Sequence, residues 1–156
     1  GVAGRPFGRA AKRGGMMGEE INFELLHAQL EAIHQAGLQA HLEQDAAFFV
    51  QDIAEDYLSV SRGHVQQPSK TAVRAQFERY LSGITFAQYE DVQPPQIGFS
   101  ADGSLAWLIA QVQAVGQQKT AVGDVADVRF VSAWLMLFEN RDGKWIRIAD
   151  ASTFKP

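Results

Sequence analysis

The sequence contains no cysteine. This absence excludes disulfide bonds, thiolate metal ligands and cysteine nucleophiles, and it is compatible with the cytoplasmic location that we expect. No uninterrupted apolar run approaches the roughly 18 residues of a membrane-spanning helix, so we expect no membrane segment. The chain also lacks a Walker motif, a glycine-rich phosphate loop and a GxSxG nucleophile motif.

Basic charge is scarce outside the first fifteen residues. The chain has 14 Lys and Arg against 18 Asp and Glu, which gives a net charge of −4. Residues 1–15 hold four of the basic residues and no acidic one, so the remainder has 10 against 18, or −8. Such an acidic body is a poor partner for nucleic acid, and we expect none. Residues 1–15 are expected to be a disordered basic extension or an expression remnant, and residues 16–156 a single domain.

Periodic apolar residues predict helices first and long strands afterwards. A long helix is expected over residues 19–43, and shorter ones over 46–51 and 70–81, where Asp45 and Ser69 can cap their N-termini. Strands are expected at residues 56–61, 65–67, 85–92, 96–100, 105–116, 124–139 and 144–154. This order predicts an α+β fold, with helices on one face of a curved antiparallel sheet.

The strand expected at 124–139 is apolar on both of its faces. One face would present Phe130, Ser132, Trp134, Met136 and Phe138, and the other Val131, Ala133, Leu135 and Leu137. A strand in a one-sided sheet alternates apolar with polar residues. Only one clear layer of helices is available, so the second face needs a cover from outside the chain. We therefore expect a homodimer packed through the outer face of the sheet.

Three segments resemble the nuclear transport factor 2-like superfamily, in particular its SnoaL-like branch. They are HLEQDAAFFVQDIAEDYLSVSRG at 41–63, SADGSLAWLIAQVQ at 100–113 and VSAWLMLFENRDGKWIRIADASTF at 131–154. The likeness extends from about residue 19 to the end of the sequence. It implies a cystatin-like cone, in which the sheet wraps around the long N-terminal helix and encloses a pocket. It also implies a homodimer through the outer sheet face.

The resemblance suggests known enzyme mechanisms, but the residues of this sequence do not fit the mechanism of the ketosteroid isomerases. Ketosteroid isomerases in the superfamily use a tyrosine in the first helix, an aspartate base ending the first strand, and an acidic donor in the penultimate strand. Gly37, Ser61 and Trp134 occupy the matching positions here. None of them supplies the required group, so we do not expect that steroid isomerase mechanism.

His41 and Asp150 are the candidate catalytic residues. His41 lies near the end of the first helix and would bring an imidazole that titrates near neutral pH. Asp150 lies late in the last strand and would bring a carboxylate if its side of the strand faces the pocket. Together they would form a proton-transfer couple. Alternatively, Asp150 forms an ion pair with Arg129 or Arg147 near the rim, and a single bulge would reverse its orientation.

The histidines of the first helix do not predict a metal site. His27, His34 and His41 recur every seven residues and therefore lie along one line of the helix. Neighbours are about 10 Å apart at 1.5 Å rise per residue, whereas a zinc–nitrogen bond is about 2 Å. One ion cannot bind all three, and we expect neither a metal nor a cofactor.

The residues expected to bind a ligand are mostly aromatic. They are Tyr57, Ser61, Trp107, Phe130, Trp134 and Ser152. They favour an apolar or aromatic small molecule, although each aromatic residue could equally be ordinary core. Two functions stay open. The first is a small-molecule-binding domain with a partly apolar pocket and cofactor-free acid–base chemistry of the isomerase, cyclase or dehydratase type. The second is a non-catalytic ligand-binding or dimerisation module.

Overall fold

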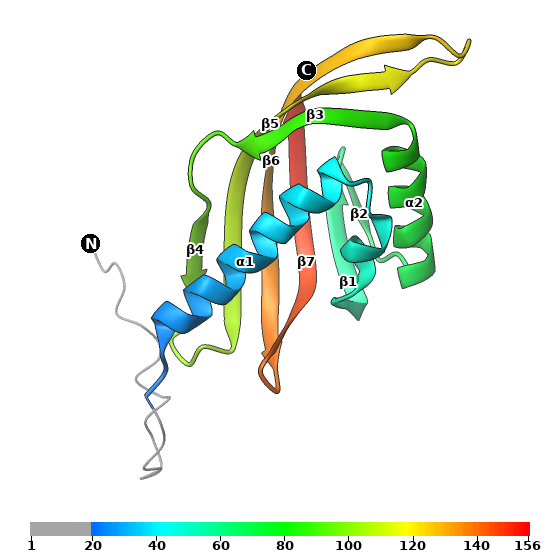
Figure 1. Cartoon of the computed structure of the whole chain (residues 1–156). Coiled ribbons are helices and arrows are strands. Elements are labelled where there is room, and N and C mark those ends of the chain that lie inside the picture. Colours follow the sequence, from blue (N-terminus) through cyan, green and yellow to red (C-terminus); the bar gives the residue numbers. More distant parts are fainter. Residues whose placement is uncertain (1–19) are drawn as a thin grey trace.

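One curved seven-stranded sheet carries the helices on its concave side in the computed structural model, which describes residues 20–156 (Figure 1). The helical segments are α1 (Phe23–Leu42), the 3-10 turn η2 (Ala46–Val50) and α2 (Lys70–Ser82). The strands are β1 (Ile53–Ser61), β2 (His64–Gln66), β3 (Ile84–Asp91), β4 (Gln96–Phe99), β5 (Leu105–Lys119), β6 (Val125–Arg141) and β7 (Lys144–Lys155). The predicted α+β architecture is confirmed. The prediction for residues 1–15 lies outside the described residues.

Short polar side chains set where the helices begin. Asn22, Asp45 and Ser69 each accept a hydrogen bond from a backbone N–H three residues later, which satisfies an otherwise free donor of the first turn. α1 therefore begins at Phe23, later than predicted, because Asn22 is the cap.

The sheet is mixed, which corrects the expectation of a purely antiparallel one. Its order is β2-β1-β7-β6-β5-β3, and β4 also pairs with β5. All pairs are antiparallel except β1 with β7, where Ser59 lies opposite Asp150 in a parallel register. Apolar alternation reveals which residues form a strand but not its direction. The last strand pairs with β6, as predicted.

α1 crosses the concave face diagonally (Figure 1), and α2 packs against β1 through Val73. The inner row of β5 is fully buried beneath α1, from Ala106 through Leu108 to Ala114. These residues pair with Phe138, Met136 and Phe130 on β6, so the predicted division of β6 into two faces is confirmed. The buried Leu30 and Leu38 of α1 contribute to the two clusters that pack against this row.

A bulge in β7 decides which of its side chains point inward. Phe138 pairs with Arg147, but the preceding residue, Leu137, pairs with Ala149. Ile148 of β7 is therefore left unpaired. Such an insertion reverses the alternation of the strand. Arg147 before the bulge and Asp150 after it therefore both lie on the concave side, the latter opposite Met136.

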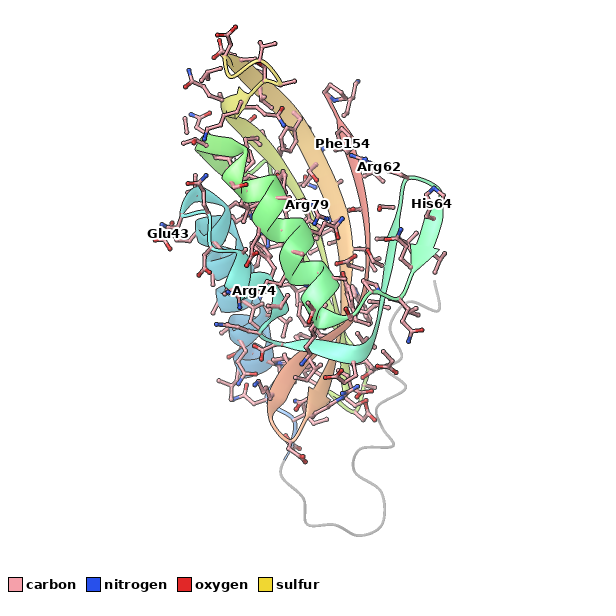
Figure 2. All side chains as sticks on the ribbon, turned by 90° about the vertical axis from the view of Figure 1, so that its right-hand side faces the viewer. Glu43, Arg62, His64, Arg74, Arg79 and Phe154 are labelled. Carbon is pink, nitrogen blue, oxygen red and sulfur yellow. The ribbon has the colours of Figure 1, made fainter. Side chains whose placement is uncertain are left out.

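The turn of the β1–β2 hairpin contacts the C-terminal end of β7. Figure 2 shows Arg62, in the turn of the hairpin, beside Phe154, with its guanidinium carbon 5.6 Å from the centre of the Phe154 ring. A cation over an aromatic face is worth roughly 0.5–1 kcal/mol at an exposed site. This contact helps to hold the short edge hairpin against the long last strand.

Candidate functional site

An interior cavity of ≈ 90 Å³ lies between α1, η2 and the inner face of the sheet. Much of its wall is apolar, from Ile33, Leu38, Phe48, Phe49, Leu108 and Phe138. Polar groups enter it from three directions: His34 and His41 from α1, Asp52 from the segment after η2, and Trp134 and Arg147 from the sheet. A concave, mostly apolar space with a few polar groups is the usual form of a small-molecule site.

Arg147 brings a guanidinium cation to the cavity, and it is almost fully buried, with 8% of the residue exposed. Its Nη2 donates to the backbone oxygen of Phe49 at 2.8 Å, and its guanidinium lies 5.3 Å from the centre of the Tyr57 ring. Its Nε is 3.9 Å from Asp150 Oδ2, which is too far for a hydrogen bond. The sequence prediction named Arg147 only as a possible rim partner of Asp150.

Asp150 belongs to a hydrogen-bonded group that lies beside the cavity and not in its lining. The Tyr57 hydroxyl donates to Asp150 Oδ2, and Ser59 Oγ donates to Oδ1 at 3.3 Å. Burial is the main cause that raises the pKa of Tyr57 well above its usual value of about 10. Tyr57 therefore stays protonated and serves as a donor, and Asp150 accepts from side chains of β1.

His41 lines the cavity as expected, but its chemistry differs from the prediction. Its ring stacks on Tyr89, with centroids 3.9 Å apart and planes 9° apart, and its Nδ1–H donates to the Gly37 carbonyl at 2.7 Å. Burial lowers the pKa of His41 to about 4. The imidazole is therefore neutral at pH 7, whereas the sequence predicted that it would titrate near neutral pH.

The proposed couple of His41 with Asp150 is not formed. His41 is held by Gly37 and Tyr89, whereas Asp150 is held by Tyr57 and Ser59. Only His41 contributes to the cavity lining. The bulge in β7 does turn Asp150 to the concave side, but its carboxylate accepts a hydrogen bond from the Tyr57 hydroxyl there.

The sequence prediction missed a second histidine–aspartate pair, His34 with Asp91. His34 Nε2 lies 2.7 Å from Asp91 Oδ1, and only 5% of His34 is exposed. Gln35 Nε2 adds a longer contact to the other carboxylate oxygen at 3.4 Å. His34 sits between Leu30 and Leu38 on the buried stripe of α1, which was visible in the sequence. The position of Asp91, at the end of β3 beside that helix, was not.

Trp134 is the one predicted ligand-binding residue that lines the cavity. Its indole Nε1 is buried and has no hydrogen-bond partner. Phe130 shares the inner face of β6 but packs instead against Phe86 and Phe154, at centroid distances of 6.1 Å and 6.4 Å. The strand alternation predicted the face correctly but not the position along it.

The other predicted ligand-binding residues lie elsewhere. Trp107 is 40% exposed on the outer face of β5, because it is odd-numbered in a strand whose even-numbered residues are buried. Tyr57 binds Asp150 outside the lining, Ser61 ends β1, and Ser152 is exposed on β7. None of these four contributes to the cavity wall.

Within residues 20–156, no group of three or more His, Asp or Glu side chains is placed to hold a metal ion. A helix long and apolar enough to cross a membrane is likewise absent from this part of the chain.

No protein-family model matches the chain, and no curated protein sequence matches it. Solved structures do resemble it. A ketosteroid isomerase-like protein from Erwinia carotovora atroseptica has 17% identity and a TM-score of 0.63, over 81% of this chain and 94% of that one. A nuclear transport factor 2-like protein of unknown function from Pseudomonas putida has 15% identity and a TM-score of 0.63, over 83% and 87%.

The association domain of C. elegans CaMKII is also similar, with 10% identity and a TM-score of 0.57, over 83% of this chain and 96% of that one. At identities this low, the likeness establishes architecture and not activity. The chain has the α+β fold of the nuclear transport factor 2-like proteins, as the resemblance in its sequence predicted.

Proposed function

We propose that this protein is a small-molecule-binding domain whose ligand occupies the cavity between α1 and the concave sheet. The observation that carries the proposal is the lining itself, in which apolar walls surround Arg147, His34 and the Trp134 indole. A packed core normally contains neither a buried cation nor an orphaned indole N–H. Apolar surfaces would supply affinity, and the few polar groups would orient the ligand.

We favour ligand binding over the alternative in which a His41–Asp150 couple catalyses a reaction. The neutral, stacked imidazole of His41 is committed to the Gly37 carbonyl, and Asp150 is committed to Tyr57. A general base must reach the proton that it removes, directly or through one water. We further propose that the chain belongs to the SnoaL-like branch, on the strength of the sequence segments that resemble it.

Met136 gives a direct test of ligand binding, because its side chain lines the cavity. With methyl-labelled methionine, titration with a neutral apolar probe such as 2-pentanone should shift the Met136 methyl resonance in a saturable manner. A Met136→Leu variant assigns that resonance. If no apolar probe moves it at millimolar concentration, the proposed function is wrong.

A filled-cavity variant supplies the matched control. Gly37 lines the cavity from α1, whereas Ala36 is exposed on the same helix. Gly37→Leu should abolish the probe-induced shift, and Ala36→Leu should leave it unchanged. Equal behaviour of the two variants would mean that the probe binds somewhere else.

The His34–Asp91 contact favours acid–base chemistry as a second candidate function. A carboxylate 2.7 Å from Nε2 can orient an imidazole on the cavity wall, as catalytic histidines require. The probe reaction is deuterium exchange at the carbon next to the carbonyl of 2-pentanone in heavy water. His34→Gln should abolish any exchange that exceeds the buffer rate. If the wild type does not exceed that rate, the non-catalytic function stands.

We also propose a homodimer formed through the outer face of the sheet. On β6, Leu135 and Leu137 are each 37% exposed, and they lie opposite Ile109 and Trp107 of β5. The row continues onto β7 and β1 through Ala149, Ala151, Leu58 and Val60. Within residues 20–156, no helix covers this face (Figure 1). The similarity to an association domain supports a second copy as the cover.

Light scattering on charge variants tests the dimer. Wild-type protein at micromolar concentration should have twice the mass of one chain, and Leu135→Arg with Leu137→Arg should have the mass of one. Val122→Arg is the control, because Val122 is 83% exposed in the β5–β6 loop, away from that face. A wild-type protein that is monomeric would overturn the proposal.

A further inference from the structure

Two buried hydrogen-bond donors of the cavity lining have no acceptor. They are the indole Nε1 of Trp134 and the Nε of Arg147, and among the described residues no other buried side-chain nitrogen or oxygen lacks a partner. A buried donor without a partner is costly, and such groups commonly await a water, an ion or a ligand. Because both nitrogens are donors, the group that satisfies them must carry hydrogen-bond acceptors, of which oxygen is the commonest.

The charge around Arg147 favours an anion as its partner. A guanidinium stays protonated at every relevant pH. Its nearest carboxylate, Asp150, is 3.9 Å away and already accepts from Tyr57 and Ser59. Asp52, also in the lining, pairs with Lys144 at 2.9 Å. Arg147 is therefore a buried cation whose ion pairing inside the fold is incomplete.

The two donors enter the cavity from different positions along the sheet. Arg147 lies opposite Phe138, and Trp134 lies four residues earlier on the same strand. At about 3.3 Å per residue, their backbone positions differ by about 13 Å along the strand, a span that the two long side chains shorten. The cavity of ≈ 90 Å³ is smaller than the roughly 150 Å³ of a cavity that binds benzene, so a ligand of five carbon atoms fits only if it is slender and a lining side chain moves.

We propose that the cavity binds a short oxo-carboxylate. Its carboxylate accepts from Arg147 Nε, and its carbonyl oxygen, at the other end of the chain, accepts from Trp134 Nε1. The inference rests on the proposed function, since it names the ligand class of the same cavity. Neither nitrogen is open to solvent, so a lining side chain moves as the ligand enters. Met136 lies on β6 between Trp134 and Phe138, and its unbranched, flexible side chain can change rotamer to admit the ligand.

The indole N–H resonances of the chain provide a direct readout with internal controls. Trp145 Nε1 already donates to Gln29 at 2.9 Å, and Trp107 lies on the outer face of the sheet. Addition of 4-oxopentanoate to ¹⁵N-labelled protein should move the Trp134 Nε1–H and Arg147 Nε–H resonances and leave the other two indoles in place. Trp134→Phe and Trp107→Phe assign these signals by deletion.

Matched probes separate the two ends of the ligand. Pentanoate lacks the carbonyl and should move the Arg147 signal only, whereas 2-pentanone lacks the carboxylate and should bind more weakly than 4-oxopentanoate. Trp134→Phe should weaken 4-oxopentanoate binding by about tenfold or more, because one hydrogen bond to a buried donor is lost, and Trp107→Phe should not.

Two results would overturn the inference. The first is an absence of movement of both nitrogen resonances with 4-oxopentanoate, and the second is equal affinity for 2-pentanone and 4-oxopentanoate. If 2-pentanone still moves the Met136 methyl signal in either case, the ligand class is wrong and the binding function stands. If no probe moves Met136, both proposals fail together.

Discussion

At the scale of single residues, Gly98 has a function that depends on a neighbouring strand. It pairs with Trp107 across β4 and β5, and a Cβ built on Gly98 would lie 2.3 Å from the indole ring. Gly98→Ala should therefore displace Trp107 and lower the free energy of unfolding by roughly 1–3 kcal/mol, as overpacking does. Urea denaturation measures the change.

The control for this substitution is Gly83→Ala, because the nearest atom to a Cβ at Gly83 is 3.6 Å away, an ordinary contact. Its cost should be smaller. In a Trp107→Leu background, the cost of Gly98→Ala should also shrink, which a double-mutant cycle detects. A cost that does not depend on residue 107 would contradict the steric explanation.

His41 predicts a pH dependence with a definite sign. Its pKa is about 4 in the folded protein and about 6.5 when exposed, so between these values the unfolded chain binds the extra proton. Stability is therefore complete above pH 6.5 and declines as the pH falls towards 4. The loss from this one group is about 3 kcal/mol, at about 1.4 kcal/mol per pKa unit.

Denaturation at several pH values, with His41→Gln as the comparison, tests this dependence. Carboxylates titrate in both proteins, so only the difference between the two curves belongs to His41. That difference should change by about 3 kcal/mol from pH 7 to pH 4. Parallel curves would show that the imidazole protonates freely in the folded state.

At the scale of the elements, α1 contains a weak position in its middle. A Cβ built on Gly37 would meet only Phe48 Cε1 within 4 Å, at 3.5 Å, which is an ordinary contact. Gly37→Ala should raise the free energy of unfolding by roughly 0.5–1 kcal/mol, because alanine restricts the unfolded chain and favours the helix. Thermal and urea denaturation measure this gain. A loss of stability would mean that the cavity cannot accept even one methyl group.

The sequence predicted the elements well because their signals are local. Asp45 and Ser69 were predicted as caps and are caps, and the alternation in β5 and β6 assigned their inner and outer faces correctly, whereas the cap Asn22 was missed. The direction of β7 beside β1 and the bulge next to Ile148 were not predictable, because both depend on pairing between distant segments. These two features determine where Arg147 and Asp150 point.

The candidate site was predicted less well than the fold for the same reason. His41 and Trp134 line the cavity, and each lies on a face with a clear period, but their roles stay a prediction. The Asp91 partner of His34 and the Tyr57 partner of Asp150 lie 57 and 93 residues away in the sequence. Spacing along the sequence cannot predict contacts between residues that come together only when distant strands pair.

At the scale of the whole molecule, the outer face of the sheet was the clearest sequence signal. The row containing Leu135 and Leu137 predicted a surface that the chain itself does not cover, and both residues are partly exposed there. A local pattern could predict this because the alternation along β6 alone shows that both of its faces are apolar. The identity of the partner is a property of the assembly, and it stays a proposal.

The parallel pairing of β1 with β7 constrains the order in which the molecule can assemble. Ser59 and Asp150 are 91 residues apart in sequence yet adjacent in the sheet. During synthesis, the β1–β2 hairpin must therefore wait without its sheet neighbour until β7 has left the ribosome. Closing such a long-range contact is slow compared with forming the β5–β6 or β6–β7 hairpins. We therefore expect the pairing of β1, which carries Tyr57, with β7, which carries Arg147, to form last.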